Sequence, residues 1–218
     1  MEDHRPIRSF GRIKARTLKP RQAGLMDTLL PHLALPEAGA IEVLGPTVLE
    51  IGFGGGEHLV AQAAAHPDTR FIGVEPFMNG VASCLRHIEE SGVQNVRLHM
   101  GDARDVVSRL PDGGVDLCYI LFPDPWPKAR HHKRRLIQPD FLGELARVTK
   151  PGAELRFATD WANYAAWTLE LFARDASFAW AAERAEDWRQ PWPGHVTTRY
   201  EAKRLGDCAP IWLRFARS

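Results

Sequence analysis

One stretch of the sequence combines a rigidly held carboxylate with a dense run of positive charge. Residues 121–135 read LFPDPWPKARHHKRR, so Asp124 lies between two prolines directly after an apolar segment. Prolines restrict the backbone on both sides and would present the carboxylate in a fixed direction, as a chemical site requires. The cations that follow are typical of a surface that binds a polyanion; they are Lys128, Arg130, Lys133, Arg134 and Arg135. We therefore expect one substrate to meet both features.

Three further carboxylates follow short apolar segments elsewhere in the chain. Glu50 lies in TVLEIGFGGG, Glu75 in RFIGVEP and Asp102 in NVRLHMGDA. The dinucleotide fingerprint G-x-G-x-x-G is broken, because its third glycine position is Glu57, whose charge would repel a pyrophosphate. A nicotinamide or flavin cofactor is therefore disfavoured. A glycine turn that lets a ligand approach the backbone is nevertheless present; it consists of Gly52, Gly54, Gly55 and Gly56.

An acidic pocket beside such a turn suits a ligand that carries positive charge and a ribose diol but no phosphate. S-adenosylmethionine fits this description through its sulfonium and ammonium groups. At the end of its strand Glu75 is placed to accept both ribose hydroxyls, and Asp102 the adenine amino group. Any one of these acids, taken alone, is better explained as a solvated turn residue. The complete set of acids and glycines at successive strand ends favours the cofactor pocket.

The proline-flanked carboxylate need not act as a general base. If the nucleophile is guanine N7, its lone pair carries no proton, and the ring gains positive charge as the methyl group arrives. Asp124 would then accept hydrogen bonds from the N1 and N2 edge of guanine and stabilise the developing cation. Trp126 offers either a stacking plane for the base or simple loop packing. The adjacent His131 and His132 face apart, so we assign no metal to them.

The elements that would position these residues alternate along the chain. Apolar strand-like segments occur in TVLEIG, 70–76, 95–103, 115–125 and 153–160, and each precedes a helix-like stretch, namely 57–65, 80–90, 104–110, 138–149 and 161–176. This alternation predicts an α/β fold with a doubly wound, mostly parallel sheet and helices on both faces. The segment AGLMDTLLPHLAL has helical apolar spacing before Pro36, and IWLRFA near the end of the sequence is strand-like.

The charge distribution is uneven. The 218 residues are 44% hydrophobic and 25% charged, with a formal net charge of +1. Residues 1–21 hold seven basic against two acidic residues, a net charge of +5, and residues 128–135 add another +5, so the rest of the chain is acidic. Two concentrated basic segments on an acidic body indicate an anion-binding protein. We expect a basic N-terminal arm with a short helix over 1–36 and a single domain over 37–218.

Other classes of protein are disfavoured by composition. No run of roughly 18 apolar residues occurs, and the first ten residues lack the apolar region of a secretory signal, so we expect a cytoplasmic protein with no membrane segment. Three cysteines that lie far apart fit neither a disulfide framework nor a metal site.

The motifs in order resemble those of the tRNA (guanine-N7-)-methyltransferase family of class I, S-adenosylmethionine-dependent enzymes. The resemblance rests on VLEIGFGGG, GVEP, GDA, LFPDPWPKARHHKRR, FATDW and TTRYEAKRLG. It implies methylation of a guanine in the variable loop of tRNA, guanine 46, by a monomer or weak homodimer. It also implies RNA contact along residues 130–135, and two sets of pocket residues. The cofactor and catalytic pocket would be lined by Glu50, Gly52, Gly54, Glu75, Asp102 and Asp124. The substrate would be contacted by Lys128, Asp160, Thr198, Arg199, Tyr200 and Glu201.

Alternatives remain at several points. Asp160 also sits where the N-cap of the helix over 161–176 belongs. The PDPW segment is similar to the motif of amino-methyltransferases that act on adenine or cytosine, although Trp126 and the basic run count against that activity. A small-molecule methyltransferase would leave the concentrated positive charges unexplained. A non-catalytic RNA-binding module would be expected to lose the glycine turn and its acids, which this chain keeps.

Overall fold

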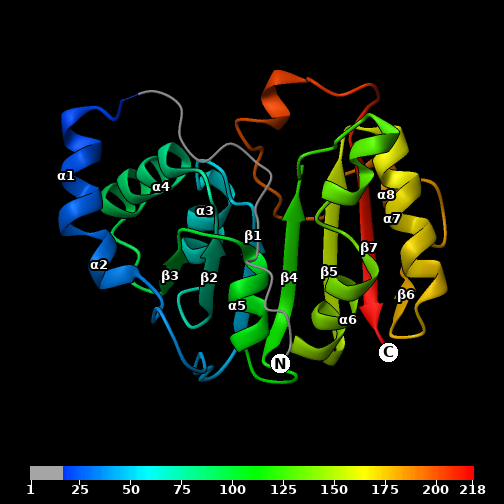
Figure 1. The fold of residues 1–218 in the computed structure, drawn as a ribbon, viewed down its shortest axis with the longest axis horizontal. Coiled ribbons are helices and arrows are strands. Elements are labelled where there is room, and N and C mark those ends of the chain that lie inside the picture. Colours follow the sequence, from blue (N-terminus) through cyan, green and yellow to red (C-terminus); the bar gives the residue numbers. More distant parts are fainter. Residues whose placement is uncertain (1–16) are drawn as a thin grey trace.

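The computed structural model describes residues 17–218, and within them seven strands form one open sheet (Figure 1). The strand order is β3-β2-β1-β4-β5-β7-β6, and β7 runs antiparallel to both of its neighbours. The doubly wound, mostly parallel sheet expected from the sequence is therefore confirmed. The strands are β1 (Thr47–Ile51), β2 (Arg70–Val74), β3 (Val96–His99), β4 (Val115–Leu121), β5 (Thr149–Thr159), β6 (Phe178–Trp180) and β7 (Ile211–Arg217).

Helices cover both faces of this sheet. They are α1 (Pro20–Thr28), α2 (Leu30–Leu33), α3 (Glu57–Ala65), α4 (Met78–Ser91), α5 (Ala103–Arg109), α6 (Pro139–Val148), α7 (Ala162–Arg174) and α8 (Glu186–Arg189), with 3₁₀ turns η1 (Ala129–Arg134) and η2 (Glu201–Lys203). The buried side chains of α3 and α4 belong to one apolar cluster, and those of α5, α6 and α7 belong to another. Two hydrophobic layers therefore sandwich the sheet.

Alternation along the strands explains why both layers form. In β1, Val48 belongs to the cluster of α3 and α4, whereas Leu49 and Ile51 belong to the opposite cluster. In β4, Cys118 and Tyr119 divide in the same way. Successive side chains of a strand point to opposite faces, so a strand covered on both sides is apolar almost throughout. This is the pattern from which the sequence predicted the strands.

The first helical segment differs in detail from the expectation. The periodic stretch before Pro36 forms two helices, because α1 ends at Thr28 and the four-residue α2 follows with Pro31 in its first turn. Figure 1 shows both helices beside α4 at the β3 end of the sheet. Arg21 of α1 pairs with Glu89 of α4 at 2.6 Å. Of the basic arm, Arg5, Arg8, Arg12, Lys14 and Arg16 lie outside the described residues.

The sheet also creates the place for a binding site. β1 and β4 are neighbours, but β2 and β3 follow on one side of them and β5 on the other. At such a switch point the loops after the strands diverge and leave a crevice at the carboxyl ends. Thus the segments after β1, β2, β3 and β4 are brought to one edge.

Candidate active site

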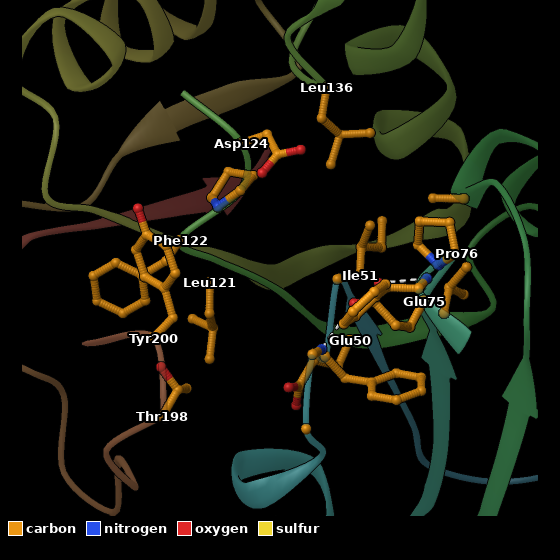
Figure 2. A pocket seen from close by; sticks show the side chains of 18 of the residues that line it. Glu50, Ile51, Glu75, Pro76, Leu121, Phe122, Asp124, Leu136, Thr198 and Tyr200 are labelled. Atoms are coloured by element: carbon orange, nitrogen blue, oxygen red, sulfur yellow. Dashed lines mark hydrogen bonds between the residues drawn. The ribbon is translucent and has the colours of Figure 1, made fainter. Parts of the chain in front are cut away.

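A cavity of about 500 Å³ lies at the carboxyl ends of β1 to β4. Figure 2 shows Glu75 on one side of it, with Asp124, Thr198 and Tyr200 across the cavity. Every residue that the sequence predicted for the cofactor pocket lines it. Its wall also includes apolar side chains that were not predicted, among them Ile51, Phe53, Pro76, Phe77, Phe122 and Leu136.

The glycine turn after β1 is tied directly to the carboxylate after β2. Gly54 has φ of 56°, a left-handed conformation that favours glycine, and its backbone N–H donates to Oε2 of Glu75 at 2.8 Å. Oε1 of Glu75 accepts from the N–H of Phe77 at 2.8 Å. Each carboxylate oxygen keeps further acceptor capacity. Glu75 therefore fixes the turn and still faces the cavity.

Burial raises the pKa of the Glu75 carboxyl, and the nearby charge of Asp124 raises it further. The hydrogen bonds from Phe77 and Gly54 act in the opposite direction. The site thus holds a buried carboxylate, Glu75, and a second carboxylate, Asp124, that repels it. Such an arrangement favours a cationic ligand between them.

The Asp124 loop is held in an unusual conformation. Phe122 and Trp126, on either side of Asp124, have φ of 50° and 43°, where non-glycine residues are uncommon. Although the Asp124 side chain is exposed at the cavity mouth, the surrounding protein desolvates its carboxyl and raises its pKa. Unlike Glu75, it accepts no hydrogen bond from residues 17–218. Its carboxylate is therefore presented to the cavity for a ligand.

Arg135 anchors this loop from behind. Its Nε donates to the carbonyl oxygen of Pro125 at 3.0 Å, and its Nη2 donates to Oδ1 of Asn163 at 2.6 Å. The guanidinium carbon lies 4.8 Å from the ring centre of Tyr164 and 5.3 Å from that of Trp167. With 1% of its surface exposed, Arg135 does not present its charge to a polyanion, which corrects the expectation that it contacts RNA.

The other cations of the run have a different environment. Lys128, Arg130 and Lys133 are exposed around η1, and no carboxylate of residues 17–218 lies within ion-pair distance of them. Arg134 is half-buried and lines the cavity, with its guanidinium 5.0 Å from the ring centre of Trp126. Trp126 also lines the cavity and packs edge-on against His131. Positive charge therefore continues from the cavity wall onto the surface.

Glu50 and Asp102 are each held by a second group of the protein. Oε2 of the buried Glu50 lies 2.8 Å from Nδ1 of His58 on α3. Asp102 is the N-cap of α5 and accepts from the N–H of Arg104 at 2.9 Å. An aspartate directly before a helical segment is the usual signal for this role. Both residues line the cavity, and the Glu50 carboxylate is buried against His58.

Asp160 is not the helix cap that its position suggested. The N-cap of α7 is Trp161, and the N–H of Ala162 donates to Oδ1 of Asp207 at 2.9 Å. Oδ2 of Asp160 instead accepts from the N–H of Gly206 at 2.8 Å. Of the two roles that the sequence left open for Asp160, the helix cap is therefore wrong, because a distant loop supplies the acceptor. Asp160 itself ties the end of β5 to the segment before β7.

The segment from Thr198 to Glu201 lies against the cavity, as the resemblance implied but the residue pattern did not. Thr198, Arg199 and Tyr200 line it, and the Tyr200 ring lies 5.9 Å from that of Phe122. Glu201 is used internally: it accepts from the N–H of Thr198 at 3.3 Å, while its own N–H donates to Oγ1 of Thr198 at 3.1 Å. This is a capping box, and the spacing T-x-x-E was the available signal.

Two structural features are absent from residues 17–218. Within them, no three His, Cys, Asp or Glu side chains are grouped as a metal site would require. None of their helices has the length and apolar character needed to cross a membrane.

Comparison with known proteins identifies similar chains. A family model described as "Putative methyltransferase" matches residues 45–212. A tRNA (guanine-N(7)-)-methyltransferase of Caulobacter vibrioides is 58% identical, over 99% of this chain and 97% of the relative. Relatives of the same name from Hyphomonas neptunium and Bradyrhizobium diazoefficiens are 50% and 49% identical, over 96% of this chain in each case and 99% and 93% of their own lengths.

Solved structures show the same fold at low sequence identity. The precorrin-6y C5,15-methyltransferase of Geobacter metallireducens has a TM-score of 0.54 at 12% identity, over 90% of this chain and 87% of its own. The 16S rRNA methyltransferase KamB has a TM-score of 0.52 at 17% identity, over 79% of this chain and 88% of its own. These likenesses show that the sheet and its helices share the fold of those methyltransferases.

Proposed function

The chain belongs to the tRNA (guanine-N(7)-)-methyltransferase family, and on that premise we propose that it transfers a methyl group from S-adenosylmethionine to N7 of guanine 46 in the variable loop of tRNA. The observation that carries the proposal is the position of Glu75 and Asp124 on facing walls of one cavity, beside exposed cations. One wall suits a cationic donor, and the other suits a purine edge. We expect the protein to act in the cytoplasm, which would supply both substrates.

The side chains at the strand ends fit the methyl donor. When bound, S-adenosylmethionine supplies an electrophilic methyl group on a sulfonium centre. Glu75 retains acceptor capacity for a diol, and Asp102 faces the same cavity. Gly54 leaves the turn free of side-chain bulk where a ligand would approach the backbone. Of these groups, the acids Glu50 and Glu75 would attract the positive charges of the donor.

On the opposite wall, Asp124 would hold the acceptor base. Its carboxylate would accept hydrogen bonds from N1–H and the N2 amino group of guanine. Because N7 carries no proton, no side chain has to remove one before the methyl group is transferred. The guanine ring becomes positively charged during the transfer, and a preorganised carboxylate of this kind contributes about 2–4 kcal/mol of transition-state stabilisation. Trp126 and Tyr200 offer aromatic planes beside it.

The exposed cations would hold the phosphates around that base. Lys128, Arg130 and Lys133 are free of carboxylate partners in residues 17–218, so their charge is available to a polyanion. Arg134 extends the positive surface to the cavity wall. This arrangement favours a structured nucleic acid over a small acceptor molecule.

A direct test uses purified protein, S-adenosylmethionine and unmodified tRNA transcripts that contain or lack guanine 46. N7-methylguanine is mapped by reduction and aniline cleavage, with Asp124→Ala as the matched variant. We expect cleavage at that guanine in the wild type and its loss in the variant. Methyl transfer without aniline-sensitive cleavage would indicate an exocyclic amine as acceptor and would refute N7 transfer. Binding of tRNA without any transfer would favour a non-catalytic RNA-binding module.

A further inference from the structure

Two buried histidines connect the cofactor side of the cavity with the segment on its acceptor side. His58, the second residue of α3, places Nδ1 2.8 Å from Oε2 of Glu50. His195 places Nε2 2.8 Å from Oε2 of Glu201. The two imidazole ring centres are 5.5 Å apart. A chain of four titratable side chains therefore runs from β1 to the capping box at Thr198.

The contacts fix how each ring is oriented. A carboxylate oxygen accepts, so Nδ1–H of His58 donates to Glu50 and Nε2–H of His195 donates to Glu201. The side chains of His58 and His195 are 0% and 4% exposed. Because a buried carboxylate without a donor is costly, each histidine stabilises the carboxylate that it contacts. The pair is thus placed to control both Glu50 and Glu201.

Aromatic side chains enclose the two rings. The Tyr119 ring meets His58 edge-on at 4.7 Å between centres. The rings of Trp212 and Trp192 meet His195 at 4.5 Å and 5.9 Å. These neighbours leave the imidazoles little room to rotate away from their carboxylates. The connection between α3 and the acceptor segment is therefore rigid.

Two more contacts join the same elements. Nε2 of Gln62 on α3 donates to the carbonyl oxygen of Gly194 at 2.7 Å. Nη2 of Arg199 lies 2.8 Å from Oε1 of Glu57, the first residue of α3. The Arg199 side chain is 57% exposed, and an exposed ion pair of this kind contributes little. The Gln62 hydrogen bond and the buried histidine pair are therefore the contacts that can hold the segment in place.

We propose, on the premise of the function proposed above, that His58 and His195 are positioning residues for the acceptor. His195 holds Glu201, and with it the capping box that places Thr198 and Tyr200 in the cavity wall. His58 joins this segment to Glu50, so that the acceptor wall is complete only when α3 and the glycine turn are in place. Loss of His195 should weaken the binding of tRNA alone. Loss of His58 should weaken the binding of both tRNA and S-adenosylmethionine.

The decisive comparison is His195→Leu against His195→Gln. Leucine fills space without a donor, whereas the glutamine amide nitrogen lies at a similar reach to Nε2 and can donate to Glu201. We expect His195→Leu to raise KM for tRNA about tenfold, as loss of a buried hydrogen bond to a charged group would, with the Kd for S-adenosylmethionine within twofold. His195→Gln should restore most of the lost affinity. His66→Leu, at the exposed C-terminal end of α3, is the control and should change neither constant.

A second readout does not depend on catalysis. The amides of Thr198, Glu201 and Ala202 are hydrogen-bonded within the capping box and its turn, so their hydrogen exchange reports its order. Exchange should quicken in His195→Leu and remain slow in His195→Gln. Unchanged exchange in His195→Leu, or a raised KM that glutamine does not restore, would overturn the proposal. A wild type that does not methylate tRNA would refute the proposed function, and the exchange comparison would then decide the positioning role by itself.

Discussion

The guanidinium of Arg135 is bonded to the carbonyl oxygen of Pro125, one residue beyond the carboxylate that faces the cavity. A cation in the middle of an apparently solvated basic run is therefore part of the structural support of Asp124. Its second partner, Asn163, belongs to α7, so the loop is fixed to a helix that packs on the sheet. The orientation of the carboxylate is set from outside the pocket.

Replacing Arg135 should destabilise the protein and impair transfer without changing its electrostatic attraction to RNA. Arg135→Met leaves the Pro125 carbonyl and the Asn163 amide without their donor, and we expect a loss of about 1–3 kcal/mol in the free energy of unfolding. Urea denaturation measures this. The control Lys133→Met, at an exposed position, should stay within about 0.5 kcal/mol of the wild type. Equal stabilities for the two variants would contradict the anchoring role.

The exposed cations should determine the salt dependence of tRNA binding. Each of Lys128→Gln, Arg130→Gln and Lys133→Gln should reduce the slope of log K against log salt concentration by about one, because one phosphate contact and its counterion are lost. Fluorescence anisotropy over a salt series measures the slope. Lys150→Gln is the control, since Lys150 pairs with Asp116 near the amino ends of β4 and β5, away from the cavity at the carboxyl ends. A slope that is unaffected in all three variants would place the RNA elsewhere.

Glu75→Gln should weaken cofactor binding selectively. The Glu75 carboxylate accepts from two backbone donors, and an amide can accept through only one of its two atoms, so either Gly54 or Phe77 loses its partner. We expect the Kd for S-adenosylmethionine to rise about tenfold or more, as loss of a charge-assisted hydrogen bond would cause. Isothermal titration calorimetry measures it, with the exposed Glu37→Gln as control. An unchanged Kd would show that Glu75 supports the turn alone.

Asp124→Asn should slow transfer while making the free protein more stable. Loss of the carboxylate should reduce kcat about 100-fold or more, as removal of other preorganised groups does. Because desolvation raises the pKa of Asp124, its ionised form is disfavoured in the folded protein at neutral pH, and the variant avoids that cost. Single-turnover kinetics and thermal melts at pH 7.5 test both effects. A lower Tm in Asp124→Asn would contradict the second.

Acidification just below neutral pH should destabilise the fold through the buried His195 and the half-buried His99. Burial is the main reason why the pKa values of His195 and His99 lie below the ordinary 6.5. The unfolded chain therefore takes up protons first as the pH falls through about 6.5, and the free energy of unfolding declines. Urea titrations at pH 7.5 and 5.5 measure the decline, which should be smaller in His195→Gln. A stability that rises over this interval would refute the assignment.

The positions of the carboxylates at the strand ends were the part of the site that the sequence predicted best. Glu50, Glu75, Asp102 and Asp124 were expected at one mouth because parallel strands bring their carboxyl ends to one edge, and the structure places all four around the cavity. The argument needed only the strand ends and the fold class. It did not need the side-chain contacts, which is why it missed the partner of Glu50.

The burial and the partners of polar side chains such as Arg135 and Asp160 could not be predicted from the strand ends and the fold class. Composition does not distinguish Arg135 from its neighbours, because its burial depends on where Pro125 and Asn163 lie in space. Asp160 precedes a helix, yet its carboxylate accepts a hydrogen bond from the backbone N–H of Gly206. The loop residue Asp207 accepts from the first turn of α7 in its place. The short strand β6 was also missed, since it pairs only with β7, the strand that lies between it and β5 in the sheet.

The place of β7 between β5 and β6 has a consequence for synthesis on the ribosome. The strands from β1 to β5 emerge before residues 211–217, so a nascent chain presents β5 with one unpaired edge and with Leu155 and Phe157 incompletely covered. The segment from Thr198 to Glu201 leaves the ribosome just ahead of the strand that completes the sheet. Translation therefore delivers the Thr198–Tyr200 part of the cavity wall late, and a partly made chain lacks that part of the cavity.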